Sequence, residues 1–98
     1  MEVGQFVLVH LLEPNERIWG RLVKLSEAGV VLRGIYVGQI ETFKFQFKGG
    51  EQQVFPQSVF FPMRRVQKID LDEPVGDIPS VIQSILDVTG MAIEEVLA

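Results

Sequence analysis

Three apolar segments follow one another closely in the first third of the chain and predict a sheet. Residues 5–12, 17–25 and 30–37 each have the length and apolar character of a strand, and the first is apolar on both faces. The segments between them, 13–16 and 26–29, contain the Pro, Asn and Gly residues that favour tight turns. Three strands so close together predict a small, strongly bent sheet.

Two glycines are expected to shape this sheet. Gly20 interrupts the second segment at a point where a side chain would obstruct a sharp bend of the strand. Gly29 can supply a positive φ in the turn that follows. A bend at Gly20 is the corner that a small barrel needs.

A different pattern begins in the middle of the chain. The segment 41–48 alternates phenylalanine with polar residues, and a period of two predicts a strand. Gly49-Gly50 then predicts a turn, with the chain returning as a strand over 52–61. The sheet would thus gain an extra hairpin at 41–53.

A proline separates the next two expected strands. Pro62 cannot donate to a β-ladder and is expected to end the strand before it. Residues 63–65 fit a single 3₁₀ turn, and 66–71 predict a short last strand. The predicted elements therefore amount to five core strands and the extra hairpin.

The remaining residues change from strand to helix patterns. After a linker, Asp77 or Ile78 is expected to cap a helix that has Pro79 in its first turn and ends before Gly90. Its apolar stripe consists of Val81, Ile82, Ile85, Leu86 and Val88. A second short helix is predicted over 91–97.

Composition indicates a single domain that associates with itself. A chain of 98 residues forms one domain, and 47% hydrophobic residues is a high fraction for a small soluble monomer, which favours a homo-oligomer. The absence of cysteine excludes disulfides and thiolate metal sites. Because no apolar run is long enough to span a membrane and residues 1–4 lack the basic start of a signal peptide, we expect a soluble, cytoplasmic protein.

Charge is distributed unevenly along the chain. The net charge of −4 argues against a dedicated nucleic-acid binder. All nine Lys and Arg residues precede Asp70, whereas residues 70–98 carry seven of the acids and no Lys or Arg. Two interpretations remain open: a solvated acidic tail, or a tail that covers a basic surface on its own subunit or on a neighbour.

Catalytic and metal-binding patterns are not recognised in the sequence. His10 is the only histidine, and no Ser or second His lies close to it in sequence, so a structural or interface role is expected. The acidic cluster of Asp70, Asp72, Glu73 and Asp77 lacks the spacing of an EF-hand and fits a solvated strand end with a helix cap. A phosphate-binding glycine loop is also absent. We therefore expect no metal, no cofactor and no enzymatic activity.

Two groups of basic residues are candidates for contact with a nucleic acid. Arg64, Arg65 and Lys68 form one basic spot, which could hold a phosphate or could be solvated or salt-bridged. Lys44 and Lys48 alternate with the phenylalanines, as in strands that stack bases beside positive charge. Strict alternation, however, places the aromatic and basic side chains on opposite faces, which favours a hairpin that packs through its phenylalanines.

The order of these elements resembles the Sm-like family over residues 4–71. Gly20 matches the glycine of the first Sm motif, and Leu22 and Leu25 occupy its apolar positions. Ser26 and Val30 stand where the family has the Asp of its turn and the Asn that helps bind a base. The resemblance therefore implies the fold of the family without its uridine-binding activity.

The resemblance also implies assembly, because Sm-like barrels form rings by pairing edge strands of neighbouring subunits. The segments 54–61 and 66–71 would be these edges. The candidate interface residues are Val54, Phe55, Val59, Phe60, Phe61, Val66 and Ile69.

We therefore expect a mainly β protein: a small, strongly bent five-stranded barrel of Sm-like or SH3-like type over residues 1–72, with an extra hairpin. Residues 73–98 form a C-terminal helical extension of the same domain. The leading expected function is a non-enzymatic, homo-oligomeric scaffold or binding module, with ring assembly and weak RNA contact as options. Two alternatives remain: a protein-interaction or regulatory adaptor without a nucleic-acid role, and a small enzyme subunit.

Overall fold

The structure, a computed structural model, describes residues 1–46 and 52–98. Its strands are β1 (Phe6–Leu11), β2 (Glu16–Leu25), β3 (Gly29–Tyr36), β4 (Gln57–Pro62) and β5 (Val66–Leu71). Its helices are α1 (Ile40–Phe45) and α2 (Val81–Thr89), and its 3₁₀ turns are η1 (Val37–Gln39), η3 (Met63–Arg65) and η4 (Ile93–Glu95). Strands β1, β2, β3 and β5 and the turn η3 lie within a residue of their predicted bounds.

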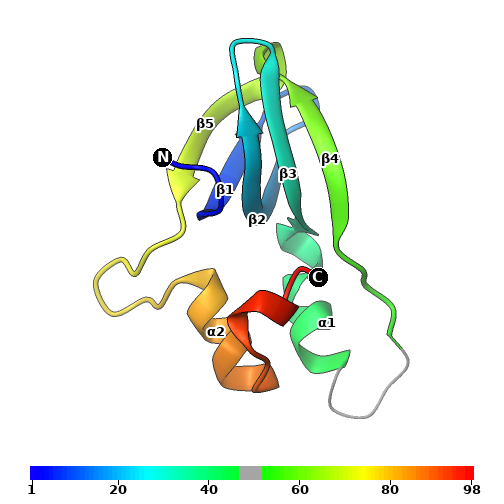
Figure 1. Cartoon of the computed structure of the whole chain (residues 1–98), viewed down its shortest axis with the longest axis vertical. Helices are drawn as coiled ribbons and strands as arrows, with labels where there is room; N and C mark the ends of the chain where they lie inside the picture. The colour runs from blue at the N-terminus through cyan, green and yellow to red at the C-terminus, as the bar shows by residue number, and fades with distance from the viewer. Residues whose placement is uncertain (47–51) are drawn as a thin grey trace.

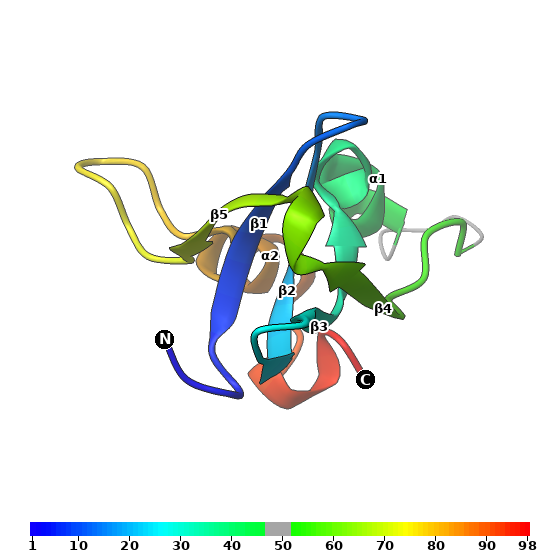
Figure 2. The same cartoon turned by 90° about the horizontal axis from the view of Figure 1, so that it is seen from above.

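The five strands form one antiparallel sheet in the order β4-β3-β2-β1-β5 (Figure 1). The predicted mainly β, five-stranded sheet is therefore confirmed. In the described part of the chain the sheet is open, with β4 and β5 as its two edges. From η3, which joins them, these two strands run to opposite sides (Figure 2).

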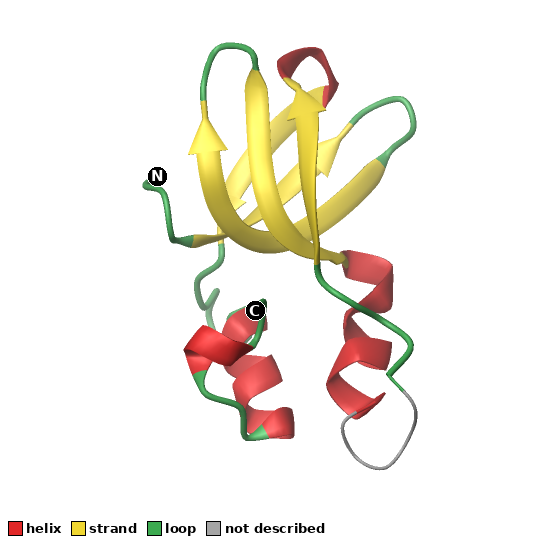
Figure 3. Ribbon diagram, turned by 45° about the vertical axis from the view of Figure 1, so that its right-hand side comes forward, coloured by secondary structure: helices red, strands yellow, loops and turns green. Residues whose placement is uncertain are grey.

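Close backbone contact at two glycines accompanies the strong curvature of the strands (Figure 3). Gly20 of β2 pairs with Gly34 of β3. A Cβ on Gly20 would lie 2.2 Å from the Arg33 carbonyl oxygen, and one on Gly34 would lie 2.1 Å from the Trp19 carbonyl oxygen. Both positions therefore require glycine, in agreement with the bend predicted at Gly20.

The positive φ expected at Gly29 is wrong. The glycines with a positive φ in the described residues are Gly4, Gly76 and Gly90. Gly29 is required for a different reason: a Cβ there would lie 2.2 Å from the Phe61 carbonyl oxygen of β4. The close approach of β3 and β4 thus excludes a side chain at this position.

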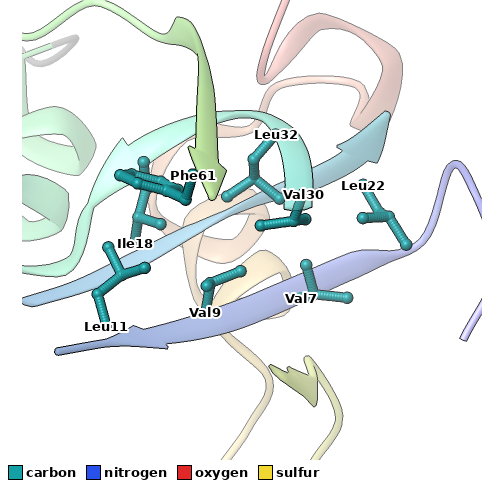
Figure 4. Close-up of a cluster of buried hydrophobic side chains, with 8 residues drawn as sticks. All are labelled: Val7, Val9, Leu11, Ile18, Leu22, Val30, Leu32 and Phe61. Atoms are coloured by element: carbon teal, nitrogen blue, oxygen red, sulfur yellow. The ribbon is translucent and has the colours of Figure 1, made fainter. Parts of the chain in front are cut away.

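Apolar residues bury both faces of the sheet. The first core fills the concave side (Figure 4) and consists of Val7, Val9, Leu11, Ile18, Leu22, Val30, Leu32 and Phe61. The second core lies between the other face and the helices and consists of Trp19, Ile35, Ile40, Phe43, Val54, Ile85, Val96 and Leu97. Two cores explain why the first strand is apolar on both faces.

The predicted hairpin at 41–53 is wrong, because residues 40–45 form α1 and β4 begins only at Gln57. Ile40 and Phe43 are buried three residues apart on one helical face, whereas Phe45 is 51% exposed. Burial of Ile40 and Phe43 in the second core stabilises a helix here, although the segment alternates apolar and polar residues as a strand does. The end of the predicted strand and its Gly49-Gly50 turn lie outside the described residues.

The tail contains one α-helix and one short turn. Ser80 caps α2, with its Oγ accepting a hydrogen bond from the Gln83 amide at 3.2 Å, so Pro79 precedes the cap instead of lying in the first turn. Gly90, at φ 69°, ends the helix. The second helix predicted over 91–97 is reduced to η4. Neither described helix is long and apolar enough to cross a membrane.

Candidate functional site

The end of the sheet that lies away from α1 and α2 is closed by chain connections (Figure 3). There the turn between β1 and β2 lies against η3. The Leu12 amide donates to the Arg65 carbonyl oxygen at 2.8 Å. The Arg65 guanidinium in turn donates to the carbonyl oxygens of Leu12 and Pro14, both at 3.0 Å. Arg65 therefore holds the two connections together.

Of the candidate basic residues in the described part of the chain, the fold sets Lys44 apart from the others. Arg64 is exposed and lines an open hollow of about 390 Å³ beside Arg65. Lys68 lies 3.3 Å from Asp70 on β5. Lys44 lies on α1, 2.8 Å from Glu41, and so belongs to the helical end of the molecule. Lys48 lies outside the described residues.

The structure brings His10 into this end of the sheet, which the sequence did not indicate. In the strand register, His10 of β1 lies between Arg17 of β2 and Lys68 of β5. Its Nε2 lies 2.9 Å from Asp70 Oδ2. Hydrogen bonds from Lys68 and from His10 lower the pKa of Asp70 below its ordinary value, although desolvation opposes them. Arg17, His10 and Lys68 thus form a row of nitrogen-bearing side chains across β2, β1 and β5. The Asp70 carboxylate lies beside this row.

Knowledge of the strand order would have been needed to find this row. His10 and Asp70 are sixty residues apart in sequence, and their contact depends on the pairing of the first and last strands. A sequence argument could have indicated it only by assuming a small barrel in which the first strand pairs with the last.

A second hollow, of about 280 Å³, opens beside this row. We call it the His10 hollow; it is lined by His10, Leu11, Asn15, Glu16, Arg17 and Gln67. The register between β1 and β5 shifts between His10 and Leu11, which leaves Gln67 as an extra residue of β5. Bulges of this kind are common beside functional sites because they redirect side chains.

The acidic cluster has a structural role at one of its members. The Asp72 carboxylate accepts hydrogen bonds from Trp19 Nε1 at 3.0 Å and from the amides of Val81 and Ile82 at 2.8 and 2.9 Å. Asp72 therefore caps α2 together with Ser80, whereas Asp77 or Ile78 was expected to be the cap. Within residues 1–46 and 52–98, no three His, Asp or Glu side chains come together as a metal site would require.

The candidate interface residues differ in exposure. Phe55 and Phe60 are 63% and 54% exposed. Val54 and Phe61 are buried in the two cores, where they are not available to another subunit in this conformation. The other three, Val59, Val66 and Ile69, are half-buried against the first core.

The tail contacts its own sheet through main-chain atoms. Arg33 of β3 donates from Nε to the Leu97 carbonyl oxygen at 3.1 Å and from a terminal nitrogen to the Ala98 oxygen at 3.2 Å. Glu94 and Glu95 remain exposed. The tail therefore covers one basic residue of its own subunit, although its acidic side chains do not make that contact.

No protein-family model, curated protein or solved structure matches this chain.

Proposed function

We propose that this chain is a small barrel of Sm-like or SH3-like type that acts as a non-enzymatic, oligomeric scaffold or binding module. The observation that carries the proposal is that the sheet has two open edges, β4 and β5, with Phe60 of β4 more than half exposed. An open edge presents unpaired N–H and C=O groups and is a template for another strand.

The strand order supports the barrel type. The edges β4 and β5 are joined only by η3, a single 3₁₀ turn, and β2 lies in close backbone contact with β3 at Gly20. A long bent second strand and a short turn before the last strand are the features on which the Sm-like resemblance rests.

The dimensions of the edges support assembly between copies. Strands β4 and β5 each contain six residues, so the β4 of one subunit can pair along its full length with the β5 of the next. Burial of the exposed part of Phe60 would add about 1 kcal/mol per contact. Because the two edges differ, this pairing is head-to-tail and closes into a ring when the rotation permits.

Light scattering at tens of micromolar protein, a concentration on the order of the dissociation constant of a weak association, tests this proposal. We expect a mass of several subunits for the unmodified chain and a monomer for Phe60→Glu. Val75→Glu is the matched control, because Val75 is also exposed (68%) but lies outside the sheet edges. An unmodified chain that is monomeric, or a Phe60→Glu variant that keeps its mass, would contradict assembly through β4.

RNA contact is the less supported part of the proposal. Arg65 donates to carbonyl oxygens and Lys68 is paired with Asp70, so that of these three residues Arg64 is exposed and has no ion pair with a described residue. If the Arg64→Ala/Arg65→Ala variant binds single-stranded RNA with the same affinity and salt dependence as the unmodified chain, these residues do not form an RNA site.

A protein-interaction adaptor is the second candidate function, and the helical end of the molecule supports it. Ile78 is 69% exposed and lines a mainly apolar hollow of about 290 Å³ with Val37, Ile40 and Val81. In this alternative the light-scattering experiment returns a monomer for the unmodified chain and for both variants.

A further inference from the structure

We propose that the His10 hollow binds a small ligand that carries a phosphate group. This inference does not depend on assembly through the sheet edges, since the hollow is formed by residues of a single chain. The hollow lies beside a row of nitrogen-bearing side chains and is large enough for a small molecule.

Two of the residues that line the hollow come from irregular parts of the fold. Gln67 is the extra residue of β5 at the register shift with β1, and Asn15 belongs to the turn that precedes β2. Both side chains are amides, which can donate and accept hydrogen bonds. They lie on either side of His10, which belongs to the central strand of the three.

The balance of charge in the hollow favours an anion. Two carboxylates lie nearby, and each has a basic neighbour: Asp70 lies 3.3 Å from Lys68, and Glu16 lies 3.8 Å from Arg65. The Arg17 side chain makes no hydrogen bond or ion pair with any residue of the described ranges 1–46 and 52–98. One guanidinium among the lining residues of the hollow therefore remains uncompensated.

The imidazole of His10 is a second hydrogen-bond donor in the hollow, besides the Arg17 guanidinium. Asp70 binds its Nε2 and thereby orients the ring, and Nδ1 has no partner in the described residues. When the imidazole is protonated, Nδ1 can donate a hydrogen bond to a phosphate oxygen. Arg17, on the neighbouring strand, can donate two parallel hydrogen bonds to the same group.

The size of the space indicates a phosphate ester in place of a bare anion. A volume of about 280 Å³ exceeds what inorganic phosphate fills and is close to the lower limit of small-molecule sites. The two amides can bind hydroxyl or ester oxygens of the remainder of the ligand. Phosphate is preferred to carboxylate because its additional oxygen allows contact with Arg17 and His10 together.

Titration of the full chain followed by NMR tests the proposal. The probes are glycerol 3-phosphate, inorganic phosphate and acetate at equal ionic strength, and the readout is the shift of the amide signals of residues 10, 15, 17 and 67. We expect saturable shifts at these positions, with the ester bound most tightly and acetate least.

Two glutamine variants separate a local site from general attraction to positive charge. Arg17→Gln is expected to weaken binding of the ester about tenfold, because glutamine can still donate a hydrogen bond but carries no charge and lacks the paired donors of the guanidinium. Arg64→Gln removes the same charge from an exposed position that does not line the His10 hollow and is expected to leave binding unchanged. The thermal unfolding curve of each variant verifies that it folds.

Three results would overturn the proposal. The first is the absence of saturable shifts at about 10 mM ester, an order-of-magnitude limit set by millimolar affinity. The second is an equal loss of affinity in Arg17→Gln and Arg64→Gln, which would indicate general electrostatic attraction. The third is binding of acetate as tight as that of the ester.

Discussion

Replacement of Asp72 by alanine is expected to destabilise the protein by about 3 kcal/mol, because one carboxylate serves two elements. Asp72 accepts from the amides of Val81 and Ile82, which lie in the first turn of α2 and have no acceptor within the helix. Loss of such a cap costs about 1 kcal/mol. Asp72 also accepts from Nε1 of Trp19, which is fully buried, and leaving that donor unpaired costs about 2 kcal/mol.

Urea unfolding followed by tryptophan fluorescence measures this loss, and Trp19 is the only tryptophan in the chain. For a chain of this length, about 3 kcal/mol corresponds to a decrease of about 15 °C in Tm. Asp77→Ala is the matched control: it removes an exposed acid five positions further on and is expected to change stability by less than about 0.5 kcal/mol. If Asp72→Ala costs no more than Asp77→Ala, the carboxylate does not hold α2 and Trp19 together.

Two further predictions concern the bend and the pH dependence. Gly20→Ala is expected to destabilise the fold by about 3 kcal/mol in thermal unfolding, because its Cβ would meet the Arg33 carbonyl oxygen. Gly38→Ala is the control, because a Cβ at Gly38 would meet no atom within 4 Å. An equal Tm for both variants would refute the close contact at Gly20. Asp70, whose pKa is lowered chiefly by the hydrogen bond from Lys68, should titrate in ¹³C NMR below its ordinary value of 3.8. Its contribution to stability is then present above that value and is lost as the pH falls through the lowered pKa. Lys68→Ala should raise the titration midpoint, and an unchanged midpoint would contradict the assigned cause.

Local patterns predicted the sheet better than the rest of the chain. The strand bounds followed from apolar runs separated by turn residues, and Gly20 was expected at a bend because only a sharp bend requires the absence of a side chain. The segment that forms α1 was misinterpreted, since a two-residue period over so few residues is also compatible with a helix that buries Ile40 and Phe43. Tertiary packing against the second core selects the helix.

The candidate site was predicted only in part. Arg64, Arg65 and Lys68 do lie near one end of the sheet, but their partners could not be predicted, since each partner comes from another strand or turn. The pairing of His10 with Asp70 was missed for the same reason. Side chains that are distant in sequence come together through strand register, which depends on the whole sheet.

The sequence by itself therefore determined the positions of β1, β2, β3 and β5, the need for glycine at Gly20 and the acidity of the tail, because these properties depend on neighbouring residues. Only the tertiary structure decided that the sheet has two open edges, that Asp72 joins the last strand to α2 and Trp19, and that Arg17 and His10 share a hollow. Each of these features depends on contacts between residues far apart in the chain. Such contacts contribute to stability only once the sheet has formed.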